Sequence, residues 1–322
     1  KQARSLNIPL IAGGRDVIGR SMEEGGLDEL VRAYGSVCTT NLSPGLMNAI
    51  LTDCRQGELK EHYALPDDAS VELVMPRRDL LRPADYFAGW CIRSSQGCDR
   101  RCPWCTVGGK GFFRKKPSTL EAELRTIHHW FFIDVADSFA NDAGFVRENV
   151  LPVYKKSGKR WGTELTVADV LEEDLVSILR SSGCRLLYIG LESVTRELNR
   201  KSSRKMAEEV ILQCRKEGIV VIGSLMLDVM GDETREEIRE VIDWAIRWLD
   251  FAQFSLPALL PGCALRKKAL RSGTVILPED WEKYGGAHAT TQHRLTLDER
   301  ARLLEEAYTR FSRFDHVMAR VL

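Results

Sequence analysis

Excess charge of either sign is missing from this sequence. Lys plus Arg and Asp plus Glu are both 46, so the formal net charge is zero. Because nucleic-acid backbones are bound through an excess of cationic groups, we expect no nucleic-acid partner. Long apolar runs are missing too. No stretch reaches membrane-spanning length, and the first residues do not have a secretory-leader pattern, so we expect no membrane span.

A paired cysteine framework is also missing. The nine cysteines are an odd number, which fits a set of disulfides poorly. Several of the scattered ones lie in apolar stretches, where a free thiol behaves as a small hydrophobic group. These scattered residues are Cys38, Cys54, Cys91, Cys184, Cys214 and Cys263. We expect them to pack in the core and the protein to work in a reducing cytoplasm.

From about residue 90 onward, strand-like runs alternate with helix-like runs. The strand-like runs are WCIRS, WFFIDVA, RWGTELTV, RLLYIGLES, IVVIGSLML and FAQFSLPALL. Such alternation predicts right-handed βαβ units and a parallel sheet. Six units are too few for a complete eight-stranded barrel, so we predict an α/β fold with a partial (β/α)6 TIM-like barrel, or a doubly wound sheet. In both cases ligands bind at the carboxyl ends of the strands.

The remainder of the chain divides around this core. Residues 1–65 contain a strand, IPLIAGG, and a helix, SPGLMNAILTDCRQG, and read as the C-terminal part of a Rossmann-like half-domain. Residues 66–88 are proline-rich and read as a linker. The core covers 89–290, and 291–322 form a helical extension. The chain starts at Lys1 with what reads as the end of a helix, so we expect further sequence upstream.

Three cysteines lie within eight positions in SSQGCDRRCPWCTVGGKG: Cys98, Cys102 and Cys105. A structural zinc site needs four ligands, and no second pair follows. A redox CxxC motif would leave Cys98 unexplained. Iron–sulfur clusters are the remaining common use of closely spaced thiolates. Three ligands on a [4Fe–4S] cluster leave one iron open, as catalytic metal sites require.

A CxxxCxxC motif after the first strand, with the aromatic Trp104 before the last cysteine, resembles the radical S-adenosylmethionine (SAM) superfamily. The resemblance covers residues 85–290. It implies that SAM chelates the open iron and that one electron from the cluster cleaves SAM to methionine and a 5′-deoxyadenosyl radical. This radical would abstract hydrogen from a substrate. An electron donor such as flavodoxin or ferredoxin would supply that electron.

The resemblance also implies SAM-binding positions. Asp137 follows the second strand, where the family holds the amino group of SAM, and Glu192 ends the fourth strand at a polar SAM contact. Glu164, on the third strand, is expected to face the cavity, and Trp104 to contact the cofactors. The alternative for each acid is a solvated loop carboxylate or a helix cap. GSLMLDVMGDET departs from the family's turn at Asp228 and Met230, so no contacts are assigned there.

The N-terminal piece resembles the second half of a cobalamin-binding domain joined to a radical SAM core. In that branch a Gly-Gly pair, here Gly13 and Gly14, lies close to the cofactor's nucleotide tail. Glycine allows close approach because it has no Cβ. The branch also has the connector Pro76, Arg77, Asp79 and Leu80, the run LPALLPGCALRKKALRSG, and DWEKYGG. The Asp-x-His-x-x-Gly cobalt-ligand motif is absent, so a cofactor-free half-domain is the alternative.

The resemblance implies a [4Fe–4S] cluster, SAM and cobalamin as cofactors, and methyl transfer to an unactivated carbon of a small-molecule or lipid-like substrate. The alternatives are radical oxidative cyclisation or ring modification, tRNA methylthiolation, and a non-catalytic scaffold that keeps the cluster as structure. Methylthiolation would need a second three-cysteine set, which Cys38 and Cys54 do not make, and a basic RNA-binding module.

Overall fold

The computed structural model describes residues 8–40, 42–65, 73–80, 90–108, 112–171, 174–196, 203–276 and 280–312. Contacts divide the chain into two compact units, each built from separate segments. The cysteine unit comprises the described parts of 1–73 with Gly97–Arg114 and Leu259–Val275. The barrel unit comprises the described parts of Val74–Gln96, Lys115–Ala258 and the chain from Ile276. Most of the predicted linker at 66–88, and residues 313–322, lie outside the described residues, and the predicted domain boundaries stay predictions.

The barrel unit contains a six-stranded parallel sheet. Its order is β11-β10-β9-β8-β7-β4, so each strand lies beside its neighbours in the sequence. The strands are β4 (Trp90–Ile92), β7 (Phe131–Asp134), β8 (Arg160–Thr166), β9 (Cys184–Glu192), β10 (Val220–Met226) and β11 (Phe251–Ser255). A doubly wound sheet would reverse its order at a switch point. The sequential order is that of a partial barrel, the first of the two predicted arrangements.

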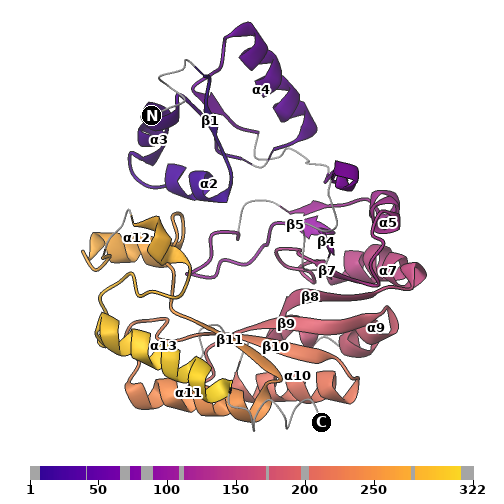
Figure 1. Cartoon of the computed structure of the whole chain (residues 1–322), viewed down its shortest axis with the longest axis vertical. Coiled ribbons are helices and arrows are strands. Elements are labelled where there is room, and N and C mark those ends of the chain that lie inside the picture. Colours follow the sequence, from indigo (N-terminus) through magenta and orange to yellow (C-terminus); the bar gives the residue numbers. More distant parts are fainter. Residues whose placement is uncertain are drawn as a thin grey trace. The chain divides into compact units, whose positions relative to one another are not determined.

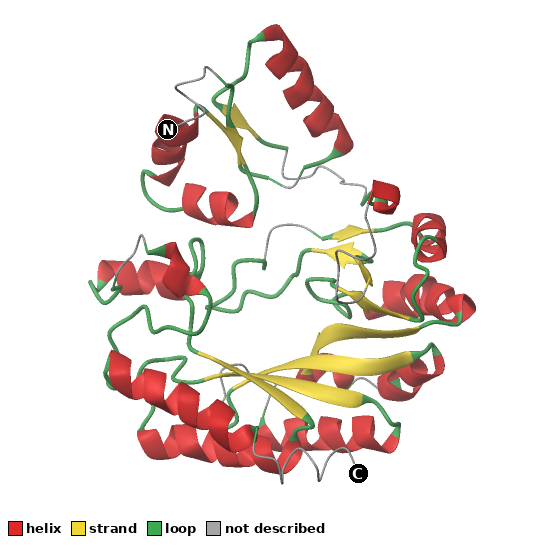
Figure 2. Ribbon diagram, viewed as in Figure 1, coloured by secondary structure: helices red, strands yellow, loops and turns green. Residues whose placement is uncertain are grey.

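Helices follow the strands and gather on one side of the twisted sheet (Figure 2). They are α5 (Pro117–Arg125), α6 (Ala143–Phe145), a π-helical turn (Val146–Val150), α7 (Leu151–Ser157), α8 (Val167–Val170), α9 (Leu175–Ser181), α10 (Arg204–Lys216), α11 (Arg235–Trp248), a 3-10 turn (Trp281–Tyr284) and α13 (Leu297–Phe311). Short elements complete the unit: β5 (Ser95–Gln96) and a 3-10 turn (Arg78–Leu80). None of the described helices is long and apolar enough to cross a bilayer.

The core of the barrel unit lies between the sheet and these helices. Alternate strand residues point into it, as the period of two requires. Trp161 on β8 is fully buried against Phe132 and Tyr154, and its indole N–H donates to the Ser182 carbonyl at 3.1 Å. The other set of alternate residues, including Glu164 and Tyr188, therefore points to the helix-free face of the sheet.

The cysteine unit holds a second, smaller parallel sheet in the order β1-β2-β3, visible beside α4 in Figure 1. Its elements are β1 (Ile11–Ala12), α2 (Arg15–Ser21), α3 (Gly26–Tyr34), β2 (Ser36–Cys38), α4 (Pro44–Gln56), β3 (His62–Tyr63), β6 (Phe113–Arg114) and α12 (Ala264–Arg271). Three successive parallel strands side by side match the last three of a 2-1-3-4-5 doubly wound sheet.

Three local patterns in the sequence predict helix features. Ser118 and Glu121 have capping-box spacing, but the N-cap of α5 is Lys116, two residues earlier, and the helix starts at Pro117, whose fixed φ suits a first helical position. Glu121 pairs instead with Arg125 and Lys156.

The run DVLEEDLVSILRSSG predicts a single helix, but the chain forms α8 and α9 there, with residues 172–173 outside the described part. Thr234 and Glu237 predict a capping box for α11, and this prediction is confirmed.

A buried group of three charged side chains joins the connector to the barrel. Arg78 pairs with Glu123 at 2.7 Å and donates to the Cys91 carbonyl, and Lys115 pairs with the same carboxylate. All three are buried. Arg77 and Asp79, the residues matched to the connector motif, instead form an exposed pair with each other. Buried charges persist only when paired, so these contacts specify where the connector meets β4 and α5.

Two glycines let the N-terminal segment pack closely against residues 259–262 within the cysteine unit. A Cβ on Gly19 of α2 would lie 2.1 Å from the Pro261 carbonyl oxygen. A Cβ on Gly262 would lie 2.9 Å from the Gly19 Cα, and Gly262 has a φ of 89°. Beside them Arg266 donates to Glu23 at 2.8 Å. The half-domain therefore depends on the run LPGCALR as a packing surface.

Gly19→Ala should destabilise the cysteine unit by about 1–3 kcal/mol, because the added methyl group overlaps backbone that has no space to move. Gly45→Ala is the matched control, since on α4 the nearest atom to its Cβ would be the Ser43 Oγ at 3.9 Å. That change should be neutral or stabilising by up to about 1 kcal/mol. Urea unfolding of the two variants checks this. Equal stability of both would contradict the packing argument.

Candidate functional site

The three clustered cysteines lie on one loop of the cysteine unit. All are free thiols and partly exposed. The Cys105 N–H donates to the Cys102 carbonyl at 3.0 Å, which forms a tight turn between the last two. The Val107 N–H donates to the Cys105 Sγ at 3.3 Å. A backbone bridge joins Cys98 to Gly108, so the loop closes on itself.

Gly108 is needed for that closure. A Cβ there would lie 1.7 Å from the Arg100 carbonyl oxygen. Trp104, partly exposed, lies in the turn between Cys102 and Cys105. The basic run GKGFFRKK after the loop is described only from residue 112, because 109–111 lie outside the described residues.

The segment Leu259–Val275 supports this loop. The Leu265 N–H donates to the Pro103 carbonyl at 2.9 Å. Cys263, predicted as a core thiol, is fully buried and its sulfur caps α12 by accepting the Arg266 N–H at 3.3 Å. Burial raises the pKa of the Cys263 thiol. The core prediction also holds for Cys38, Cys184 and Cys214, whereas Cys91 is exposed and Cys54 is partly exposed.

Gly13 and Gly14 end β1 in the same unit. Both are exposed, and a Cβ on Gly14 would meet no atom within 4 Å. Gly14 has a φ of 102° and stands at the N-cap of α2, a conformation that L side chains rarely adopt. The backbone here is open to a ligand.

In the barrel unit, polar side chains line the helix-free face of the sheet. The Tyr188 hydroxyl donates to Gln253 Oε1 at 2.7 Å across the sheet. Burial raises the pKa of Tyr188, and the carboxylates of Glu164 and Glu192 raise it further, while the hydrogen bond with Ser224 lowers it. Glu164 is exposed on this face beside Tyr188. Strand periodicity would have identified Tyr188 and Gln253, which sequence analysis missed.

Asp137 follows β7, as predicted, at the carboxyl edge of the sheet. Its carboxylate lies 4.0 Å from the guanidinium of Arg93, which follows the neighbouring strand β4. The Asp137 side chain is largely buried while that of Arg93 is partly exposed. This edge therefore offers a carboxylate and a guanidinium to a zwitterionic ligand.

Glu192 closes β9 in an unusual backbone conformation. Its φ is 59°, in the left-handed region, and the register with β10 shifts at this point, where Ser224 pairs with Gly190 and Leu225 with Glu192. A β-bulge of this kind redirects a side chain at a strand end. Burial raises the pKa of Glu192 to about 7. Strained backbone with a perturbed carboxyl is typical of functional positions.

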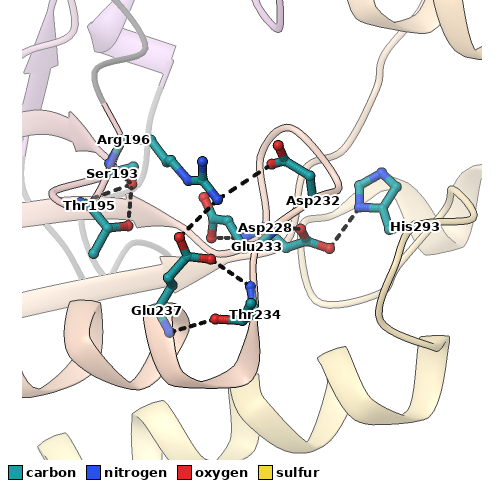
Figure 3. A network of polar contacts seen from close by, with 9 residues as sticks. All are labelled: Ser193, Thr195, Arg196, Asp228, Asp232, Glu233, Thr234, Glu237 and His293. Atoms are coloured by element: carbon teal, nitrogen blue, oxygen red, sulfur yellow. Dashed lines mark hydrogen bonds and ion pairs between the residues drawn. The ribbon is translucent and has the colours of Figure 1, made fainter.

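A polar network lies at the ends of β9 and β10, and Figure 3 shows the part of it that contains Asp228, Glu233 and His293. Asp228, with a φ of 60°, accepts the Glu233 N–H at 3.2 Å. Its Oδ2 lies 2.8 Å from His293 Nδ1, and His293 Nε2 lies 2.8 Å from the Thr291 hydroxyl. With its proton on Nδ1, His293 donates to Asp228 and accepts from Thr291.

Buried charges balance within this network. The Arg300 guanidinium, fully buried, lies 3.8 Å from the Asp228 carboxylate and donates to the Thr291 carbonyl. Burial raises the pKa of the neighbouring Glu233 to about 7. Sequence analysis left Asp228 unassigned and did not single out His293. Their pairing joins residues 65 positions apart, so no local pattern could reveal it.

Arg196 extends the network from the turn after β9. Its guanidinium lies 2.9 Å from Glu237 and 3.9 Å from Asp232 (Figure 3). Glu237 also accepts the Thr234 N–H at 2.8 Å as part of the α11 capping box. The loops after β9 and β10 are thereby connected to each other and to the start of α11.

Asp228→Asn should destabilise the protein by about 3 kcal/mol, because it leaves the buried Arg300 guanidinium without a counter-charge. Asn tolerates the left-handed backbone, so strain is not the cause. The control is Asp243→Asn, which removes an exposed carboxylate that pairs with Arg310. Arg310 lies on α13, as Arg300 does, and this change should cost below about 1 kcal/mol. Chemical denaturation measures both. A cost for Asp228→Asn no larger than the control would contradict the pairing.

Glu192 should make stability depend on pH. A carboxyl with a raised folded pKa contributes stability that is fully present below its unfolded pKa and lost as pH rises through about 7. Glu192→Gln should match the wild type near pH 4.5 and exceed it by about 1–3 kcal/mol at pH 8. Urea unfolding across this range measures the difference, with the exposed Glu305→Gln as control. A pH-independent difference would exclude the raised pKa.

Comparisons with known proteins show what this chain is similar to. The profile described as the radical SAM superfamily matches residues 92–245. A curated relative, bacteriochlorophyllide d C-12(1)-methyltransferase of Chlorobaculum tepidum, is 22% identical over 213 residues, which are 61% of this chain and 45% of that protein. The chain thus spans less than half the length of this relative.

Solved structures agree on the fold. The radical SAM methyltransferase TsrM from Kitasatospora setae, solved with cobalamin and a [4Fe-4S] cluster, has a TM-score of 0.66 at 14% identity, over 95% of this chain and 68% of that one. The cobalamin-dependent SAM radical enzyme OxsB has a TM-score of 0.57 at 13% identity, over 84% of this chain and 44% of that one. Such identities show the fold alone. The cysteine loop and the sequential parallel sheet agree with the profile match of residues 92–245 to the radical SAM superfamily.

Proposed function

We propose that this radical SAM enzyme transfers a methyl group to an unactivated carbon of a small-molecule or lipid-like substrate with the help of cobalamin. One observation carries the proposal. The cysteine unit combines the three-cysteine loop, the small parallel sheet ending in Gly13 and Gly14, and the segment that contacts both. Cluster-binding and cobalamin-binding candidates thus belong to one compact body.

The cysteine loop fits a [4Fe–4S] cluster in its donor chemistry. Cys98, Cys102 and Cys105 are free, partly exposed thiols, and the Val107 N–H already donates to one sulfur, as hydrogen bonds to cluster ligands do. Within the described residues no three Cys, His, Asp or Glu side chains are placed closely enough to hold one ion. The three sulfur atoms would therefore have to approach one another when a cluster binds, and the turn at Cys102–Cys105 would shape the loop.

The end of β1 fits a flat, bulky ligand. Gly14 presents backbone with no atom within 4 Å of the place where a Cβ would stand. A side chain there would both strain the backbone and occupy that space. Gly13 and Gly14 are accordingly the residues that would lie against cobalamin.

The carboxyl edge of the barrel unit fits the polar groups of SAM. Asp137 would accept from the ammonium of SAM, and Arg93 beside it would face its carboxylate. Glu192, with its raised pKa, would gain an acceptor role once a cationic or hydroxyl donor approaches, and Glu164 offers a further acceptor on the same face. Trp104 in the cysteine loop is a candidate for stacking against a cofactor.

When bound, the cluster and cobalamin supply the one-electron and methyl-transfer chemistry. This chain's own residues bind and orient. The buried network of Asp228, His293 and Arg300 holds the loop after β10, and Arg196 connects the loop after β9 to it through Asp232 and Glu237. These contacts would keep Glu192 in its left-handed backbone conformation. Misplacement of such groups by even about 1 Å lowers rates strongly.

Anaerobically reconstituted protein should cleave SAM with a strong reductant, and Cys102→Ala should not. The control is Cys54→Ala, a free cysteine of α4 outside the loop, which should keep activity within about twofold. Chromatography measures 5′-deoxyadenosine, left by reductive cleavage, and S-adenosylhomocysteine, left when SAM gives up its methyl group. Equal deoxyadenosine from Cys102→Ala and wild type would overturn the assignment of the cluster.

The same assay separates the candidate chemistries when cobalamin and a substrate are present. Methyl transfer requires S-adenosylhomocysteine to accumulate with methylated product. Deoxyadenosine without S-adenosylhomocysteine would indicate ring formation or oxidation instead. A scaffold would bind the cluster and yield neither product.

A further inference from the structure

Positive charge is concentrated in two segments of the cysteine unit. Residues 97–114 and 259–275 together contain eight Lys or Arg and one Asp, in a chain whose formal net charge is zero. The two segments touch, since the Leu265 N–H donates to the Pro103 carbonyl within the cysteine loop. The basic residues that the structure describes in these segments therefore lie on and directly beside the loop of Cys98, Cys102 and Cys105.

The charges of α12 are available to a partner. Lys268 and Arg271 are exposed and Lys267 is partly exposed, and none of the three makes an ion pair with another described residue. They line an open hollow of about 530 Å³ with Ala264 and Ser272. Arg266, on the same helix, behaves differently because it is buried and paired with Glu23.

An apolar residue lies among these cations. Leu270 has 40% of its surface exposed on α12. Lys267 and Arg271 are three positions before it and one after it, and Arg101 is exposed on the cysteine loop. An apolar centre with a charged rim is the arrangement of a protein–protein contact. Unpaired like charges raise the local potential and steer an oppositely charged protein by up to several orders of magnitude in association rate.

We propose that these residues, Arg101, Lys267, Lys268 and Arg271 around Leu270, form the docking surface for an acidic electron-carrier protein. The inference rests on the proposed function, which requires one electron from outside the chain for each reductive cleavage of SAM at the cluster. The reduced carrier loses one electron and the oxidised cluster gains it; no bond forms or breaks and no proton is transferred in this step. The surface suits the task because Arg101 lies on the loop that would hold the cluster and α12 contacts that loop through Leu265, and tunnelling demands a short path.

The test measures docking directly, with oxidised flavodoxin as the probe and the cluster-loaded enzyme as its partner. Because oxidised flavodoxin cannot react, binding is read without catalysis. We expect the wild-type Kd to rise at least tenfold between 50 and 300 mM salt, because screening weakens exposed charge pairs. Lys268→Glu/Arg271→Glu should raise the Kd at least tenfold at 50 mM salt and remove most of this salt dependence.

The matched control is Lys155→Glu/Lys216→Glu, which reverses two exposed lysines on helices α7 and α10 of the barrel unit. It makes the same change in net charge and should alter the Kd less than twofold. Equal weakening by both double variants would overturn the proposal, since it would show an effect of overall charge. A Kd for flavodoxin that Lys268→Glu/Arg271→Glu leaves unchanged would also overturn the proposal. Salt-dependent binding of an oligonucleotide, without binding of flavodoxin, would overturn it too.

A second readout separates this inference from the proposed function. With dithionite as reductant, Lys268→Glu/Arg271→Glu should form 5′-deoxyadenosine at the wild-type rate, whereas with reduced flavodoxin its rate should fall at least tenfold at low flavodoxin. If the wild type makes no deoxyadenosine with dithionite, the proposed function fails. If the wild type makes deoxyadenosine with dithionite but the substitutions leave the Kd for flavodoxin unchanged, only the proposed docking surface fails.

Discussion

Parallel strands in one sheet end at the same edge, and this constraint organises the barrel unit. Because β4 to β11 lie in sequential order, each loop after a strand lies beside the loop after its neighbour. Asp137, Glu192 and Asp228 are far apart in the sequence but all follow or end strands of this sheet. The fold thus collects polar groups at one edge while its helices bury the apolar residues on the other side.

Buried charge pairs keep that edge in shape. Arg78 and Lys115 both pair with Glu123, and Lys115 also donates its N–H to the Ser94 carbonyl at 2.7 Å. Ser94 and Lys115 flank the cysteine loop in the sequence. The Arg78, Lys115 and Glu123 group therefore holds both ends of the segment that carries this loop. Asp228 with Arg300 does the same for the loop after β10. Each pair is costly to break because a partner left alone would be a buried charge.

The cysteine unit uses a different device, which is close backbone contact. Gly19 and Gly262 allow α2 to approach the run that also supports the cysteine loop, where no side chain would fit. The basic face of α12 follows directly from this arrangement. Arg266 turns inward to Glu23, while Lys268 and Arg271 remain outside. The same short helix therefore serves packing on one face and is free to contact a partner on the other.

The sequence by itself determined the local features of this protein. The spacing of Cys98, Cys102 and Cys105, the alternation of strands and helices, the α11 cap at Thr234 and the position of Glu192 at a strand end are all readable over a few residues. These features depend on backbone periodicity and on contacts within one or two helical turns. That is why most strands and helices of the core could be predicted, and why the superfamily was recognisable.

Only the tertiary structure decided what depends on distant pairing. The sequential strand order settled the choice between a partial barrel and a doubly wound sheet. Three contacts join residues that are far apart in the sequence. His293 and Asp228 are 65 positions apart, Arg266 and Glu23 are 243 apart, and Gly19 and Pro261 are 242 apart. No periodicity encodes such partners, because burial and charge compensation are set by whichever segments the fold brings together.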